Sequence, residues 1–183
     1  MTDHPKPRGT TFIERVPAGA PAVAPVTAPA AEPAAEPAAA LTPAARDANA
    51  REVVGRMLAR DTFSQWLGVE VLEVADRQAV VRMTVRPEMM NGFGFAHGGI
   101  VFAFADSAHA FCSNSSGEIS VAVDCNISYP APIRVGDVLT ATAIQQTSTN
   151  RLAFSEIMVR NQDDTIVALF RGTVYRTRKP LPE

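Results

Sequence analysis

The sequence predicts an α+β fold, in which an antiparallel β-sheet packs on one long apolar helix. Three observations support this prediction. The stretch of small and apolar residues Gly98–Asn114 is longer than a normal strand and contains no proline. Two strand-like runs precede this stretch, and four follow it. Runs of strands around a single helix are typical of α+β domains.

The first part of the chain is not expected to join this domain. Residues 1–45 hold nine of the 14 prolines of the 183-residue chain, together with long alanine runs. Each proline removes an amide donor and clashes with the preceding helical turn. We therefore expect a disordered or polyproline-like tail over residues 1–45 and a folded domain over residues 46–183. The alternative for the tail is a docking segment for a partner.

The domain is expected to begin with a helix over residues 45–66, where apolar side chains recur at three- and four-residue steps. Further along, Val81, Met83 and Val85 alternate with polar residues, which indicates a strand with one face in water. The expected strands are residues 69–75, 78–86, 119–129, 137–148, 151–161 and 165–176, and the expected central helix is residues 98–114. One helix cannot cover both faces of six strands, so we expect some of this surface to contact another subunit.

Charge and composition exclude several classes of protein. The 17 basic and 19 acidic residues give a net charge of −2, which argues against a nucleic-acid-binding protein that relies on a strong positive field. No apolar run approaches the ~18 residues that span a bilayer, so no membrane partner is expected. The first residues lack the pattern of a secretory signal. The two cysteines, Cys112 and Cys125, show neither CxxC nor metal-type spacing. We therefore expect a cytoplasmic protein without disulfide or metal site, in which both cysteines pack as small apolar groups.

The chemistry is expected in the segment Asn91–Gly99 and at Asp106. Gly98 and Gly99 start the central helix, where the first N–H groups have no intrahelical partner and the helix dipole favours negative charge. Such a place suits a carbonyl oxygen that becomes an oxyanion. The alternative is that both glycines only permit close packing of helix on sheet. Asp106 lies in an otherwise apolar part of the helix, and a half-buried carboxylate there is a candidate base or nucleophile.

Helix geometry indicates that two chains build the site. Gly98 and Asp106 are eight residues apart, which corresponds to ~12 Å of helix rise. A reacting carbonyl carbon must lie ~3–3.5 Å from the attacking atom, so Asp106 cannot reach an oxyanion held at the start of its own helix. A two-fold dimer with antiparallel central helices would place Asp106 of one chain near Gly98 of the other. His109, three residues after Asp106, either hydrogen-bonds this carboxylate or is a structural histidine with satisfied hydrogen bonds, and we favour the second interpretation.

The string NGFGFAHGGIVFAFADSAHAFCSNSSG resembles the signature of the hotdog-fold acyl-CoA thioesterases, and is similar to their phenylacetate-degradation (PaaI) type. The likeness extends over about residues 50–178 and includes VGDVLTATA and the terminal TIVALFRGTVYR. It implies one long helix wrapped by a curved antiparallel sheet, and dimers that usually pair into tetramers. It also implies hydrolysis of an acyl-CoA thioester with no cofactor besides the coenzyme A of the substrate.

The resemblance assigns roles to residues that this chain retains. Asn91 would position the attacking water or the carboxylate, and His97 would support the loop and orient the thioester. Gly98 would donate its N–H to the thioester oxygen, with Gly99 also in contact with the substrate. Asp106 of the partner chain would be the general base or the nucleophile, and the sequence leaves both roles open.

The residues that bind the rest of the substrate are less defined. Phe93 and Phe95 either line a pocket for an aromatic acyl group or seal the loop. Many relatives carry a Tyr/Phe-Leu-Arg-Pro string where this chain reads YPAPIR, so the basic residue is displaced to Arg134 and its contact with the coenzyme A phosphates stays open. In some relatives a Ser or Thr on the preceding strand assists the water. The local candidates for that role are Asp124, Asn126 and Ser128.

The sequence therefore favours hydrolysis of an acyl-CoA by a homodimer that pairs into a homotetramer. By resemblance alone, the acyl group is an aryl-acetyl group such as hydroxyphenylacetyl. One alternative is a hydratase of enoyl or hydroxyacyl thioesters, although the usual His-Phe-Pro-Gly-like loop is absent. The other alternative is a non-catalytic acyl-CoA-binding subunit that uses the tail as its interaction element.

Overall fold

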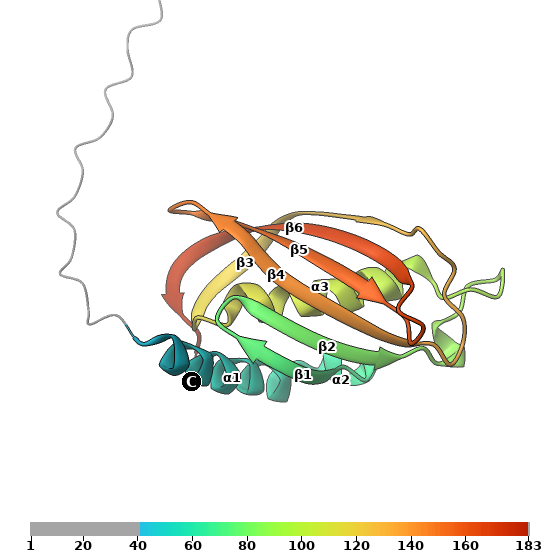
Figure 1. Ribbon diagram of the computed structural model, residues 1–183, viewed down its shortest axis with the longest axis horizontal. Coiled ribbons are helices and arrows are strands. Elements are labelled where there is room, and N and C mark those ends of the chain that lie inside the picture. Colours follow the sequence, from blue (N-terminus) through green and yellow to red (C-terminus); the bar gives the residue numbers. More distant parts are fainter. Residues whose placement is uncertain (1–40, 183) are drawn as a thin grey trace, which may run out of the picture. The chain divides into compact units, whose positions relative to one another are not determined.

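The computed structural model describes residues 41–182 of the chain (Figure 1). The tail expected over residues 1–45 lies outside the described residues as far as residue 40. In chain order the elements are α1 (Pro43–Arg60), α2 (Thr62–Leu67), β1 (Glu70–Ala75), β2 (Gln78–Thr84), the 3-10 helix η1 (Pro87–Met89), α3 (Gly98–Asn114), β3 (Glu118–Ser128), β4 (Val138–Ser148), β5 (Leu152–Arg160) and β6 (Ile166–Pro180). None of the helices in this part of the chain is both long and apolar enough to cross a bilayer.

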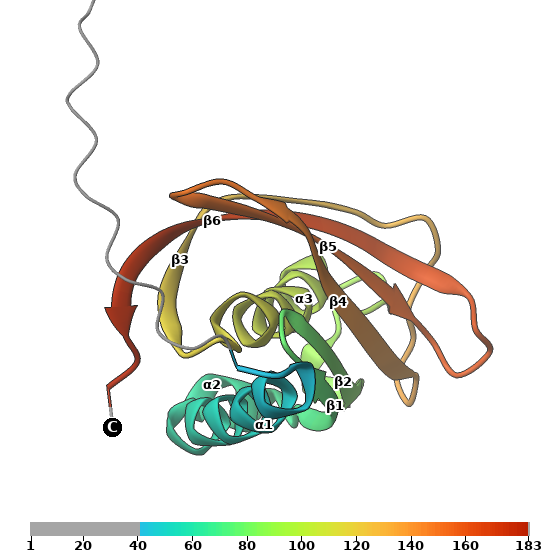
Figure 2. The ribbon, with the colours of Figure 1, turned by 60° about the vertical axis from the view of Figure 1, so that its left-hand side comes forward.

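The strands form a six-stranded sheet in the order β1-β2-β4-β5-β6-β3, in which every neighbouring pair is antiparallel. The sheet curves around α3, which lies against its inner face (Figure 2). Helix α1 packs against β1 and α3. This arrangement confirms the α+β class and the curved antiparallel sheet wrapped around a long central helix.

The start of the domain differs from the expected single helix over residues 45–66. Helix α1 begins at Pro43, because the Thr42 side chain accepts the N–H of Ala45 and proline suits the first helical turn. The helix then breaks at Asp61, whose carboxylate accepts the N–H groups of Phe63 and Ser64. The prediction of one continuous helix was wrong because Asp61 caps a second helix, α2, in place of continuing the first.

The core lies between α3 and the inner face of the sheet. Phe104, Ala108 and Phe111 of α3 are each at most 1 % exposed. Burial of each phenylalanine stabilises the fold by ~1.5–3 kcal/mol. Opposite them, β4 presents Ala141 and Ala143, which are fully buried and small enough for the helix to approach closely.

The two edges of the sheet are β1 and β3, and β3 is the more apolar edge. Val121 and Val123 of β3 are 48 % and 58 % exposed. A long edge strand presents unpaired backbone N–H and C=O groups and is a template for pairing with another chain. The single chain therefore leaves an open apolar edge directly beside α3.

Candidate functional site

The loop before α3 is organised by Asn91. Its side-chain oxygen accepts the N–H groups of Phe93 at 2.8 Å and Phe95 at 3.2 Å, and its own N–H donates to the Phe95 carbonyl at 2.8 Å. Gly94 between them has a positive φ of 80°, which glycine adopts without strain. The side-chain NH2 of Asn91 has no hydrogen-bond partner among the residues that the structure describes. Asn91 thus holds the loop and still presents two donors.

The two glycines at the start of α3 differ in their hydrogen bonding. His97 is the N-cap, and its Nδ1 accepts the N–H of Gly99 at 3.0 Å. This contact requires an unprotonated Nδ1, so the hydrogen of a neutral His97 lies on Nε2. The N–H of Gly98 has no partner within residues 41–182. Gly98 is therefore the glycine of this pair whose N–H is available to a ligand, whereas the N–H of Gly99 is already used by His97.

Tyr129 holds the backbone carbonyl of Gly98. Its hydroxyl donates to the Gly98 carbonyl at 2.7 Å, and a Cβ on Gly98 would lie 3.4 Å from the tyrosine ring. Burial raises the pKa of Tyr129, which keeps its hydroxyl a donor at neutral pH. The sequence analysis assigned no role to Tyr129, since only the fold brings the end of β3 against the start of α3.

Asp106 lies on α3, with its side chain 46 % exposed. The separation of eight positions between Gly98 and Asp106 places them ~12 Å apart along one helix. The structure therefore does not bring Asp106 to Gly98 within a single chain, as the spacing predicted. On the same helix, the Nδ1 atom of His109 lies 3.9 Å from Asp106 Oδ1.

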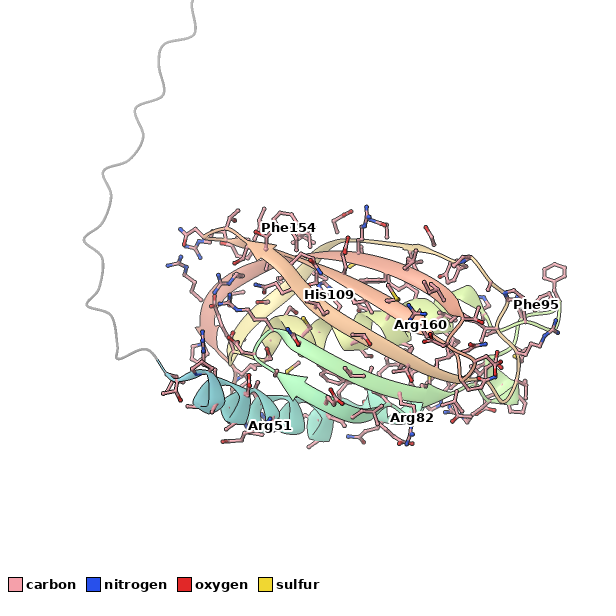
Figure 3. All side chains as sticks on the ribbon, viewed as in Figure 1. Arg51, Arg82, Phe95, His109, Phe154 and Arg160 are labelled. Atoms are coloured by element: carbon pink, nitrogen blue, oxygen red, sulfur yellow. The ribbon has the colours of Figure 1, made fainter. Side chains whose placement is uncertain are left out.

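His109 is buried between α3 and the sheet (Figure 3), with only 1 % of its side chain exposed. Its ring rests on Gly172 of β6, where a Cβ would collide with it. Its Nε2 has no hydrogen-bond partner in the described part of the chain. The favoured interpretation of His109 as a structural histidine with satisfied hydrogen bonds was therefore wrong for this nitrogen.

Cys125 completes a cluster with Asp106 and His109. A carboxylate oxygen of Asp106, a ring nitrogen of His109 and the Cys125 sulfur all lie within 4.8 Å of one another. Burial, together with the negative charges of Asp106 and Asp124, raises the pKa of the Cys125 thiol to about 11. Sequence spacing carried no signal for this cluster, because the register of β3 against β6 sets Cys125 beside Gly172.

The aromatic residues of the loop lie at the surface of the chain. Phe93 is 88 % exposed and Phe95 is 36 % exposed. Phe95 lies on the loop that projects beyond the sheet (Figure 3), and the Arg134 guanidinium sits 5.4 Å from the centre of its ring. The structure thus joins two of the expected substrate-binding residues, Phe95 and Arg134, through a cation–π contact.

The strand candidates for assisting the water lie on the outer face of the sheet. Cys125 and Ile127 of β3 are partly buried, whereas the alternating residues between and beside them are exposed. Those exposed residues are Asp124, Asn126 and Ser128. Asn126 and Ser128 line a hollow of about 600 Å³ that also includes Arg160 and Arg171. They therefore face away from Asp106 of their own chain.

Comparisons with known proteins place this geometry in context. The family model described as "Thioesterase superfamily" matches residues 93–168. The chain is 38 % identical over 120 residues to "Acyl-coenzyme A thioesterase PaaI" of Escherichia coli (strain K12). The aligned region covers 66 % of this chain and 86 % of that protein. The solved structure of the E. coli PaaI protein from the phenylacetic acid degradation operon is 34 % identical, with a TM-score of 0.73 over 74 % of this chain and 99 % of that one. A Streptococcus mutans protein bound to acetyl CoA is 25 % identical, with a TM-score of 0.60 over 62 % of this chain and 91 % of that one.

Proposed function

The chain belongs to the thioesterase superfamily as a hotdog-fold protein of the PaaI type, and from this premise we propose that it hydrolyses acyl-CoA thioesters to the free acid and coenzyme A. The observation that carries the proposal is the N–H of Gly98 at the start of α3, which has no hydrogen-bond partner among the described residues. A donor at that position is ready for a carbonyl oxygen, and the positive end of the helix dipole favours the negative charge that develops there. Water is the second substrate, and the reaction as proposed needs no metal or redox cofactor.

The other loop residues act on the same carbonyl group. The Gly98 N–H donates to the thioester oxygen, and Tyr129 keeps this peptide unit in place by holding the Gly98 carbonyl. His97 aligns the helix start through its bond to Gly99 and presents Nε2–H towards the thioester. The unpaired side-chain NH2 of Asn91 orients the attacking water or the carboxylate.

Asp106 of a second chain supplies the base or the nucleophile. Because the helix keeps Asp106 and Gly98 of one chain ~12 Å apart, a complete site needs both residues from different chains. The open edge at β3, with its exposed valines, supports a two-fold dimer in which the β3 edges of two chains meet. We also propose that dimers pair into a tetramer, for which Ile144 and Leu169 on the outer sheet face offer exposed apolar surface.

The dimer proposal predicts that the double variant Val121→Lys/Val123→Lys separates the two chains and, for that reason, also loses thioesterase activity. Lysines on an edge strand repel a second copy and are solvated in the monomer. We expect sedimentation to show monomers and turnover to fall by at least ~100-fold, since each monomer lacks the partner carboxylate.

The matched control is Leu72→Lys on β1, the opposite edge of the sheet, where the apolar side chain is 45 % exposed. This variant should keep both the assembly and the activity. A monomeric β3 variant that turns over at the wild-type rate would contradict a site shared between chains.

The preferred acyl group is proposed to be aryl-acetyl, such as hydroxyphenylacetyl. Phe93 and Phe95, on the loop that precedes Gly98, offer exposed aromatic surface to such a ring, and Arg134 over the Phe95 ring offers a positive charge to the phosphates of coenzyme A. The solved structure of the E. coli relative is of a protein from the phenylacetic acid degradation operon, which supports the same acyl class. A cytoplasmic location stays a prediction from the sequence.

A thiol-release screen tests the function. Aryl-acetyl, short-chain and long-chain acyl-CoA substrates are compared after treatment of the protein with a chelator. We expect kcat/KM for the aryl-acetyl substrates to exceed that for acetyl-CoA by at least ~10-fold, because a filled aromatic pocket contributes binding energy that a methyl group cannot. Crotonyl-CoA serves to detect a hydratase, which would bleach the conjugated thioester without releasing thiol. Absence of thiol release from every substrate would reject the proposed hydrolysis.

A further inference from the structure

Three side chains of different chemistry converge between α3 and β3. Asp106 offers a carboxylate oxygen, His109 a ring nitrogen and Cys125 a sulfur, and these atoms lie within 4.8 Å of one another. Mixed nitrogen, oxygen and sulfur donors suit Zn²⁺ and its close relatives, whereas Mg²⁺ and Ca²⁺ prefer oxygen alone. The donor set therefore selects a chemical class of ion.

The fold fixes one donor and leaves the other two adjustable. The His109 ring is clamped between α3 and Gly172, where no side chain would fit. Asp106 is 46 % exposed, so its carboxylate can rotate and an ion can enter from solvent. Cys125 is partly buried on β3, the strand that pairs with β6. Tetrahedral zinc with bonds of ~2.0–2.3 Å needs donors ~3.4 Å apart, so the donors have to close by at most ~1.5 Å, which side-chain rotation supplies.

His109 also has a partner available for its other nitrogen. Ser155 of β5 is the register partner of Gly172, and its buried hydroxyl is likewise without a hydrogen bond among the described residues. When Nδ1 binds a metal, Nε2 carries the hydrogen, and metal-binding histidines almost always donate that hydrogen to a neighbour. Because the His109 ring lies on Gly172 and Ser155 is the register partner of that glycine, the Ser155 hydroxyl is the candidate acceptor for the Nε2 hydrogen.

We propose that Asp106, His109 and Cys125 form a binding site for a zinc-class divalent cation, and that occupation of the site withdraws Asp106 from thioester hydrolysis. The second half of this inference rests on the proposed function. The ion displaces the thiol proton of Cys125 to solvent and binds the thiolate. A carboxylate that coordinates the ion can neither attack a carbonyl nor accept a proton from water. The cation would thus act as an inhibitor of the same site.

Binding is tested without reference to activity. Co²⁺ is titrated into the chelator-treated full chain, because a cobalt–thiolate bond gives a charge-transfer absorption in the near ultraviolet. We expect a saturable band with one Co²⁺ per chain, displaced by Zn²⁺. Cys125→Ser should abolish the band, whereas the matched variant Cys112→Ser should keep it, since the Cys112 thiol donates to the Arg77 carbonyl in the turn between β1 and β2 and is not part of the cluster. His109→Gln should weaken Zn²⁺ binding by at least ~10-fold.

A band that survives in Cys125→Ser, or no saturable band in the wild type, would overturn the site. Should His109→Gln fail to fold, the two cysteine variants still decide the question.

Inhibition is tested on the same preparations. Zn²⁺ should inhibit the wild type at the concentration that fills the site, and Cys125→Ser should keep its basal turnover and need at least ~10-fold more Zn²⁺ for half inhibition. Equal inhibition of both proteins, or activation by Zn²⁺, would overturn the inhibitory role. If the metal-free wild type releases no thiol from any acyl-CoA, the proposed function fails, while the cobalt titration still reports on the metal site.

Discussion

Replacement of Asp106 by Asn is expected to lower kcat by about 10²–10⁴-fold while the dimer persists. The amide keeps the shape of the carboxylate and can neither accept a proton nor attack a carbonyl. The side chain is 46 % exposed and makes no short ion pair, so the substitution should leave the melting temperature close to that of the wild type.

Steady-state thiol release, together with sedimentation of the same sample, checks this result. The control is Asp163→Asn in the exposed turn between β5 and β6, which removes an equal charge outside α3 and its loop and should leave kcat unchanged. Near-normal kcat in Asp106→Asn would remove the carboxylate from the mechanism.

The same residue allows its two proposed roles to be separated. Hydrolysis in heavy-oxygen water places the label in the Asp106 carboxylate after repeated turnovers if the carboxylate attacks the thioester and water then opens the resulting anhydride at the aspartyl carbonyl. The label stays in the product acid alone if Asp106 only activates water. Mass spectrometry of the peptide that contains Asp106 distinguishes these outcomes.

Replacement of Gly98 by Pro is expected to lower kcat by about 10²–10³-fold, which is ~3–4 kcal/mol of transition-state stabilisation. Proline removes the N–H that is proposed to bind the oxyanion. The backbone accepts it, because Gly98 is the first residue of α3 and His97 before it has φ −64° and ψ 127°, a conformation compatible with a following proline. The variant therefore deletes one donor and leaves the helix intact.

The matched control is Gly98→Ala. Both variants introduce a Cβ at 3.4 Å from the Tyr129 ring, and the alanine variant retains the N–H. We expect Gly98→Ala to keep most of the wild-type kcat and Gly98→Pro to lose it, with similar circular dichroism and melting temperatures. Equal activity in the two variants would show that the Gly98 N–H does not stabilise the transition state.

Most of the secondary structure was predictable because it depends on local patterns. The apolar stretch of α3 begins and ends where expected, at Gly98 and Asn114. Errors arose where a distant or competing contact decides the outcome. Asp61 splits the first helix by capping the second. Strand β6 runs four residues beyond its expected end at Arg176, because Glu118 at the start of β3 pairs with Pro180 and binds the Arg176 side chain at 2.9 Å.

The candidate site shows the same division. Its chemical residues were recognisable because they lie on one loop and one helix, where spacing translates directly into geometry. The role of each hydrogen-bonding group was not recognisable. Whether the N–H of Gly98 or of Gly99 is free depends on the rotamer of His97, and whether Arg134 reaches Phe95 depends on the path of the loop after β3.

By itself, the sequence determined a helix that carries an amide donor at its first residue and a carboxylate two turns later, at a separation that one chain cannot bridge. The tertiary structure alone decided that His109 lies on Gly172, a glycine that is flanked in the sheet by Cys125 of β3 and Ser155 of β5. The physical reason is that helical spacing follows from covalent geometry and local hydrogen bonds. The neighbours of a buried ring follow from strand register, which joins segments that are distant in the chain.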